Sequence, residues 1–106
     1  SMLTETPRDF VLQQNYPNPF NPLTTIEYHL PHQGYVVLAI YNLAGQHIRT
    51  LVDEPQNAGA HSQIWNTMDE YGNTVSSGIY VYRIYFQTKA AGREGWQSER
   101  KMVLLK

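Results

Sequence analysis

The chain has 106 residues, of which 42% are apolar and 16% are charged, and it contains no cysteine. This length suits one domain with a single modest core, and the lack of cysteine excludes disulfides, thiolate chemistry and cysteine-ligated zinc. Eight basic and nine acidic residues give a net charge of −1, which excludes the strongly basic surface that binds nucleic acid or an anionic membrane.

The first residues of the chain carry little information about its destination. Ser1 and Met2 are interpreted as a cloning remnant, so residues 3–106 are predicted to form one domain. No basic-then-apolar leader opens the chain, and no apolar run approaches the roughly 20 residues that span a bilayer. We therefore expect no direct insertion into a membrane, while the missing leader leaves the location of a larger parent protein open.

Apolar alternation predicts the strands of the first half of the chain. In chain order these are residues 10–12, 24–30, 35–41 and 47–52. The first is short and is expected at a sheet edge, and the second alternates cleanly until Pro31 ends it. The third is apolar on both faces, which favours a central position. It is joined to the fourth by a turn ending in Gly45, which predicts a β-hairpin.

The second half is predicted to contain three more strands separated by polar loops. The strands are residues 61–65, 76–88 and 96–106, and the loops are residues 53–60, 66–73 and 88–95. Trp65 is expected to point inward. With no competing helical period, the pattern predicts an all-β fold, an immunoglobulin-like antiparallel β-sandwich of about seven strands.

A spacing within the strand at residues 76–88 is typical of this fold. Gly78, Tyr80 and Tyr82 lie two residues apart, as in a tyrosine corner, where a tyrosine hydroxyl caps the backbone of the preceding loop. We assign Tyr80 to the corner and Tyr82 to the core. The alternative is plain alternation in a tyrosine-rich strand.

The segment QNYPNPFNP, which we call the connector (residues 14–22), can be neither a helix nor a central strand. Its members Pro17, Asn18, Pro19, Asn21 and Pro22 predict an extended, stiff segment. The rings of Tyr16 and Phe20 are expected to anchor it, each contributing roughly 1.5–3 kcal/mol if fully buried. We interpret the connector as an edge-covering loop that blocks strand-to-strand aggregation. A ligand groove between the two rings is the alternative.

Five blocks in fixed order carry a family resemblance: QNYPNPFNPLTTIEYHLP, GYVVLAIYNLAGQHIRTLVD, AGAHSQIW, SSGIYVYRI and KMVLLK. The sequence resembles the C-terminal sorting domains of type IX (Por) secretion cargo and the related FlgD-like immunoglobulin domains. The resemblance implies a non-catalytic address and attachment module at the end of a larger exported protein. It assigns the sorting motif to Lys101, Met102, Val103, Leu104, Leu105 and Lys106, and a structural pair to Gly78 and Tyr80.

The implied partners are the secretion machinery, as a sorting receptor or outer-membrane translocon, and the rest of the parent polypeptide. The implied location is secreted or cell-surface, reached through the periplasm and outer membrane. One hypothesis is that a receptor adds a strand to the exposed edge of the sorting motif. The alternative function is a structural FlgD-like module or an accessory adhesion domain that binds carbohydrate.

The sequence departs from the family pattern in its turns. Asn42 and Gln46 stand where the family usually has an acidic residue and an arginine, and Trp65, Asn66 and Thr67 stand where it has W, D and G. Because these positions lie in turns, they cast doubt on a loop-borne binding role more than on the fold.

No catalytic constellation is present, so we expect neither an enzyme nor a cofactor. His29, His32, His47 and His61 have no metal-ligand spacing and are interpreted as surface residues. Two acidic clusters in predicted loops, Asp53–Glu54 and Asp69–Glu70–Asn73, could offer oxygens to calcium, but neither has an EF-hand spacing, and turn-forming charges are the preferred reading. Trp96 and Tyr71 are the candidates for an aromatic platform that would bind sugar rings.

Overall fold

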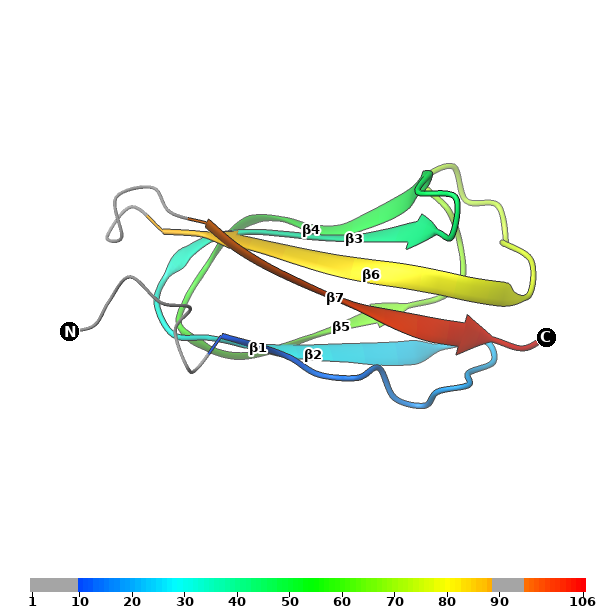
Figure 1. Ribbon diagram of the computed structural model, residues 1–106, viewed down its shortest axis with the longest axis horizontal. Coiled ribbons are helices and arrows are strands. Elements are labelled where there is room, and N and C mark those ends of the chain that lie inside the picture. The colour runs from blue at the N-terminus through cyan, green and yellow to red at the C-terminus, as the bar shows by residue number, and fades with distance from the viewer. Residues whose placement is uncertain (1–9, 89–94) are drawn as a thin grey trace.

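The computed structural model describes residues 10–88 and 95–106, and within them seven strands form two layers with no helix (Figure 1). The strands are β1 (Val11–Leu12), β2 (Thr24–Leu30), β3 (Gly34–Asn42), β4 (His47–Gln56), β5 (Gly59–Trp65), β6 (Gly78–Gln87) and β7 (Gly95–Leu104). The predicted all-β, immunoglobulin-like sandwich is confirmed.

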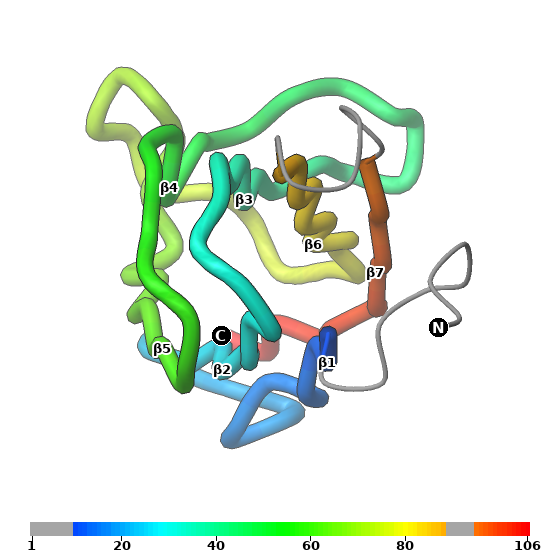
Figure 2. The backbone as a smooth tube through the Cα atoms, turned by 90° about the vertical axis from the view of Figure 1, so that its left-hand side faces the viewer, coloured from blue at the N-terminus to red at the C-terminus, as the bar shows by residue number. Residues whose placement is uncertain are grey.

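One layer is a three-stranded sheet in the order β1-β2-β5, and the other is a four-stranded sheet in the order β4-β3-β6-β7. Every neighbouring pair is antiparallel. Viewed along its length, the sandwich has β4 and β5 at one side and β1 and β7 at the other (Figure 2). The predicted edge position of β1 and the interior position of β3 are both confirmed.

The core lies between the two layers and follows the period of two of the strands. On β2, β3 and β6 the inward residues are almost wholly buried, as the alternation predicts. They are Ile26, Tyr28 and Leu30, then Val36, Leu38 and Ile40, then Tyr80, Tyr82, Ile84 and Phe86. Trp65 at the end of β5 is fully buried among them, and Met102 and Leu104 complete the core from β7.

The predicted loop at residues 53–60 is wrong in part. β4 continues to Gln56 and β5 begins at Gly59, so only Asn57 and Ala58 remain between them. The polar residues of this stretch extend a strand because they pair with the start of β3, where Pro55 faces Tyr35. Proline is tolerated there because β4 is an edge strand, on which a missing backbone donor breaks no ladder.

The tyrosine corner has the predicted geometry. The Tyr80 hydroxyl donates to the backbone carbonyl of Ser76 at 2.7 Å, which ties the loop before β6 to the strand. Tyr82 is fully buried, as assigned. The predicted hairpin at residues 88–95 falls mostly on residues 89–94, which lie outside the described residues, although β6 and β7 on either side pair in antiparallel register.

Candidate functional site

The connector lies along the outer edge of the last strand, where residues far apart in sequence meet. The Phe20 N–H donates to the Val103 carbonyl at 3.0 Å, and the Leu105 N–H donates to the Phe20 carbonyl at 3.0 Å. The Val103 N–H donates to Oδ1 of Asn18 at 2.9 Å. These bonds satisfy the backbone groups that β7 would otherwise present at its edge. The interpretation of the connector as an edge-covering segment is confirmed.

The residues just before and within the connector close the same side of the sandwich. Gln14 Nε2 donates to the Lys101 carbonyl at 2.8 Å. Arg100 Nε donates to the Leu12 carbonyl at 2.7 Å. Together with the bonds at Asn18 and Phe20, they leave no open edge along the last third of β7. In the folded domain the chain itself therefore occupies the edge that the strand-addition hypothesis needs, and recognition of the sorting motif by a receptor stays a prediction.

The two aromatic rings of the connector behave differently, so half of the anchoring prediction is wrong. Phe20 is 2% exposed and packs against Trp65 with ring centroids 5.9 Å apart. Tyr16 is 79% exposed. Its backbone instead exchanges hydrogen bonds with Thr25 at 2.9 and 2.8 Å, which turns the ring away from the core. One buried and one exposed ring cannot line a common groove, so the alternative ligand groove is wrong as well.

A buried polar group orders the start of the connector, and sequence reasoning missed it. Asn15 is 2% exposed, and its Nδ2 donates to Thr24 Oγ1 at 2.9 Å and to the Pro17 carbonyl at 3.1 Å. The Thr24 hydroxyl donates to the same Pro17 carbonyl at 2.9 Å. Asparagine is common in turns whatever its burial, so its type alone did not mark this position.

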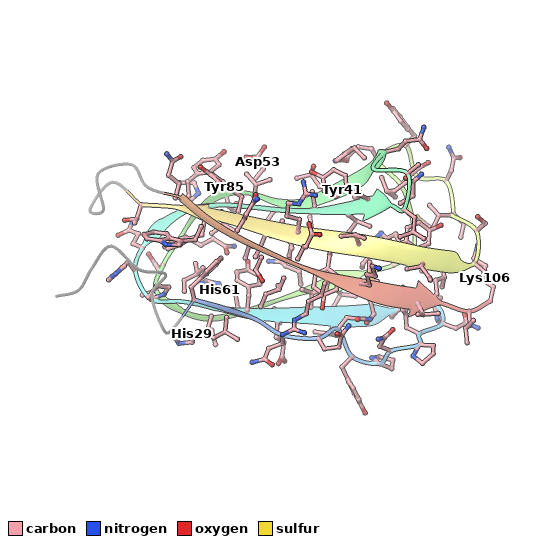
Figure 3. All side chains as sticks on the ribbon, viewed as in Figure 1. His29, Tyr41, Asp53, His61, Tyr85 and Lys106 are labelled. Atoms are coloured by element: carbon pink, nitrogen blue, oxygen red, sulfur yellow. The ribbon has the colours of Figure 1, made fainter. Side chains whose placement is uncertain are left out.

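The six sorting residues divide into two groups by the face they occupy. Met102 and Leu104 are fully buried and belong to the core. Lys101, Leu105 and Lys106 are exposed, and Val103 is partly exposed. Lys106 lies at the opposite end of the sandwich from His29 and His61 (Figure 3). The six residues of the motif are thus contiguous at one end of the fold, but only the exposed ones are available to another molecule.

Gly78 lies beside the sorting residues, since it pairs with Leu104 across β6 and β7. Pro17, Pro19, Asn21 and Pro22 of the connector are all exposed. The connector, the corner and the sorting motif therefore meet at one end of the fold.

Burial raises the pKa of Tyr82 to about 12, with the Asn15 backbone and the Arg100 guanidinium acting in the opposite direction. Its hydroxyl donates to the Gln13 carbonyl at 2.6 Å, next to the connector. The folded state thus holds Tyr82 in its neutral form. The contribution of neutral Tyr82 to the free energy of unfolding is complete below the ordinary tyrosine pKa of about 10. It is lost as the pH rises through the pKa that Tyr82 has in the folded state.

We expect the free energy of unfolding to fall by about 1–2 kcal/mol more in the wild type than in Tyr82→Phe between pH 9.5 and 12. Phenylalanine keeps the ring and removes the ionising group. Burial also raises the pKa of Tyr28, and both proteins retain that residue, so the difference reports Tyr82. Urea unfolding followed by circular dichroism measures it. Equal losses in the two proteins would contradict the assignment.

The acidic clusters use their oxygens within the fold. Asp69 Oδ1 accepts the N–H groups of Asn73 and Tyr71, both at 2.9 Å, and these backbone donors, that of Asn73 foremost, lower the pKa of Asp69. Glu70 accepts the Thr50 N–H at 3.0 Å. Asp53 lies in β4 and accepts the Tyr35 hydroxyl. The turn-forming reading therefore fits the second cluster, whereas the first is part of a strand.

The two family departures in the β3–β4 turn compensate each other. Asn42 Oδ1 accepts the Gln46 N–H at 2.9 Å, and Asn42 Nδ2 donates to Gln46 Oε1 at 2.8 Å. A neutral amide pair thus stands where the resemblance leads one to expect opposite charges. After β5, Thr67 adopts a φ of 66° at the position where the family has glycine. A β-branched residue is strained in this left-handed region.

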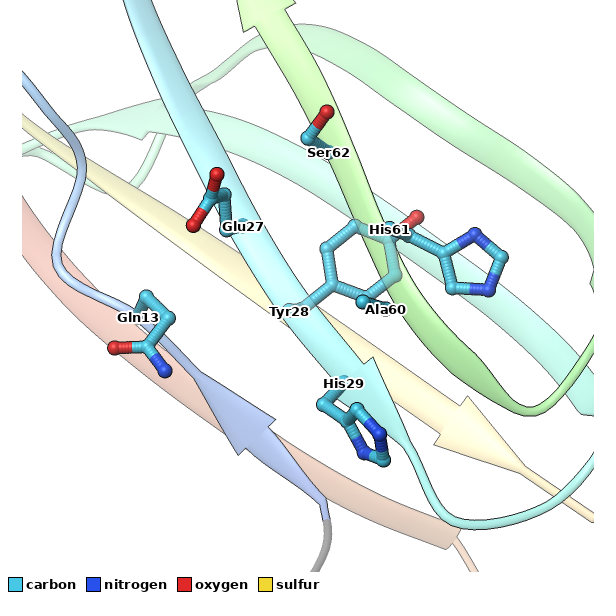
Figure 4. Close-up of a pocket in the computed structure, with 7 residues that line it drawn as sticks. All are labelled: Gln13, Glu27, Tyr28, His29, Ala60, His61 and Ser62. Atoms are coloured by element: carbon cyan, nitrogen blue, oxygen red, sulfur yellow. The ribbon is translucent and has the colours of Figure 1, made fainter.

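A shallow pocket lies over β2 and β5 (Figure 4). It is lined by Gln13, Glu27, Tyr28, His29, Ala60, His61 and Ser62. The His61 ring stacks on Tyr28 with centroids 5.4 Å apart, and its Nε2 lies 2.8 Å from the Asn57 carbonyl. Within residues 10–88 and 95–106, no group of three or more histidine or acidic side chains is arranged to hold a metal ion.

The proposed aromatic platform for sugar rings is wrong. Trp96 pairs with Phe86 at one end of β6 and stacks on its ring with centroids 5.9 Å apart. Tyr71 lies in the loop anchored at the other end, where the neighbouring Glu70 N–H donates to the Ile48 carbonyl. The two rings therefore cannot contact one sugar chain side by side. Trp96 packs on the core, and Tyr71 is 87% exposed.

The described part of the chain holds no helix that is long and apolar enough to cross a membrane.

Comparison with known proteins points to one family. The FlgD Ig-like domain family matches residues 23–90, more than half of the chain. No curated protein sequence shows a significant match. The family match spans β2 to β6, so the connector and β7, which form the site described above, both lie outside it.

Three solved structures illustrate the similarity in fold. PorU from Porphyromonas gingivalis, described as dimeric and latent, has a TM-score of 0.73 and 19% identity over 96% of this chain and 10% of its own. FlgD from P. aeruginosa has a TM-score of 0.63 and 18% identity over 76% of this chain and 61% of its own. PorZ, described as an essential bacterial surface component of the type IX secretion system of P. gingivalis, has a TM-score of 0.54 and 18% identity over 88% and 11%. This chain thus spans less than two thirds of each protein.

Proposed function

The chain belongs to the family of FlgD Ig-like domains, and from this premise we propose that it is a non-catalytic module that directs type IX secretion and cell-surface attachment of a larger exported protein. The observation that carries the proposal is the terminal motif, whose outward residues are held in one conformation by the connector. An ordered, exposed segment offers a sorting receptor or translocon a surface that needs no further ordering on binding.

The comparisons support a module of a longer polypeptide. The chain matches 10% of PorU and 11% of PorZ, and PorZ is described as a surface component of the type IX secretion system. We therefore propose that the partners are the secretion machinery and the rest of the parent protein. The proposed location is secreted or cell-surface, reached through the periplasm and the outer membrane.

The non-catalytic reading is supported by the roles that the polar residues already have. His47 contacts Thr50 and His61 contacts the Asn57 carbonyl, while Asp69 and Glu70 accept backbone N–H groups. These contacts hold turns and strands in place.

The second candidate is a structural FlgD-like module without a sorting role. The family match favours it, because it covers β2 to β6 and not β7. FlgD from Xanthomonas campestris, described as capping the hook in flagellar assembly, has a TM-score of 0.59 over 88% of this chain. A module of this kind would join or space neighbouring domains.

A reporter fusion separates the two candidates. A folded periplasmic reporter carrying this chain at its C-terminus is produced in a bacterium with a type IX system, and surface and medium fractions are assayed. We expect export of the fusion and retention of the reporter alone. A matched control carries the immunoglobulin-like domain of a flagellar FlgD, which tests whether the fold suffices. Periplasmic retention of a folded, intact fusion would contradict sorting and favour the structural module.

A further inference from the structure

The edge of the last strand is closed, so recognition of the sorting motif requires another surface. On β7 the residues facing outward from the sandwich alternate with the buried Met102 and Leu104. Val103 lies opposite Ile79 on β6, and Leu105 follows in the same phase. Ile79 is 42% exposed and Leu105 is 53% exposed. We call Ile79, Val103 and Leu105 the outer patch.

Lys101 lies on the same face of β7 as Val103, Lys106 directly follows Leu105, and neither lysine forms an ion pair with another described residue. Lys101 and Lys106 are exposed, and among residues 10–88 and 95–106 the only ion pair joins Arg83 to Glu99 at 2.9 Å. Glu99 is thus engaged with Arg83, although it lies on the same face of β7 as Lys101. The surface therefore combines an apolar centre with an unpaired basic rim, which matches the composition of many protein interfaces.

We propose that the export receptor binds the outer patch through an apolar pocket rimmed by carboxylates, and not through the edge of β7. This inference rests on the proposed sorting function. The basic rim selects an acidic partner surface by charge complementarity. An anionic membrane could offer similar chemistry, but the net charge of −1 opposes adsorption of the whole domain. A protein surface is the occupant that these observations favour.

The outer patch is tested by Leu105→Asp and Ile79→Asp in the exported reporter fusion. Each change places a negative charge in the patch, and Leu105 lies beyond the last residue of β7, so its replacement leaves the core untouched. We expect at least a tenfold lower exported fraction while both variants retain a cooperative thermal transition, with the midpoint unchanged for Leu105→Asp and lowered by a few degrees for Ile79→Asp. Gln97→Asp is the matched control because Gln97 is exposed on the same face of β7, away from the patch. Its export should equal that of the wild type.

The basic rim is tested by charge reversal and by charge conservation. Lys101→Glu combined with Lys106→Glu is expected to lower export severalfold, whereas the double replacement by arginine should retain it.

Strand addition is tested by Asn18→Ala, which removes the side-chain hydrogen bond to the Val103 N–H at the edge of β7. If strand addition were the mode of recognition, Asn18→Ala would increase export and Leu105→Asp would leave it unchanged, which would overturn the inference.

The outcomes distinguish the inference from the function on which it rests. Failure of the wild-type fusion to leave the periplasm overturns both. Export of the wild type together with normal export of Leu105→Asp and Ile79→Asp overturns only the outer patch. Sedimentation of the purified chain with phosphatidylglycerol vesicles tests the membrane alternative, and binding that Leu105→Asp abolishes would also overturn the protein partner. We expect no binding to these vesicles.

Discussion

Replacing Phe20 by alanine is expected to lower the free energy of unfolding by about 3–5 kcal/mol, the range for a buried phenylalanine. The ring is 2% exposed and packs against the fully buried Trp65. Its loss leaves a cavity under the connector and weakens the hold of Phe20 on the backbone of Val103 and Leu105. Because a domain of this size has only about 5–15 kcal/mol in total, the change removes a large share.

The matched control is Tyr16→Ala in the same connector. That ring is 79% exposed, so its removal is expected to change the free energy of unfolding by less than about 0.5 kcal/mol. Urea unfolding followed by tryptophan fluorescence measures both variants, since Trp65 contacts Phe20 and reports the connector directly. Equal destabilisation by the two substitutions would refute the division between an anchoring and an exposed ring.

Deleting residues 101–106 is expected to unfold the domain, so that no cooperative thermal transition remains. The deletion removes two fully buried side chains, Met102 and Leu104. Each costs about 2–5 kcal/mol when reduced to alanine, and full removal adds the loss of pairing with the first residues of β6. The summed loss is comparable to or larger than the whole free energy of unfolding of a small domain. Circular dichroism melting and the dispersion of amide proton signals measure the outcome.

A shorter deletion provides the control. Removing Leu105 and Lys106 alone loses the N–H bonds to the Phe20 carbonyl and to Ser77 Oγ, for an expected cost of about 1–2 kcal/mol. The fold should survive. A cooperative transition in the six-residue deletion would contradict the assignment of Met102 and Leu104 to the core.

This pair of deletions bears on how sorting is tested. Loss of export after removal of residues 101–106 would report an unfolded domain as readily as a missing signal. Substitutions of outward residues avoid the ambiguity, because Leu105 and Lys101 are exposed while their neighbours Met102 and Leu104 carry the packing. The burial pattern of the motif therefore decides which variants are informative.

The sequence by itself determined that there are seven strands and which faces of β2, β3 and β6 are buried, although not where β4 ends and β5 begins. The alternation in β2 and β3 predicted which side chains enter the core, and the spacing of Gly78, Tyr80 and Tyr82 predicted that Tyr80 caps the preceding loop, which it does at Ser76. These features are readable because side-chain direction in a strand repeats every two residues, which is a local property of the chain.

Only the tertiary structure decided how the connector and the last strand are used. Asn18 and Val103 are 85 residues apart, and their hydrogen bond closes the edge that the sequence left open. Composition marks Tyr16 and Phe20 alike as aromatic anchors, but backbone pairing with Thr25 turns one ring outward while the other meets Trp65. Which ring is buried and which edge is covered depend on backbone groups and cavities that are distant in sequence but close in the fold. No local sequence pattern encodes that proximity.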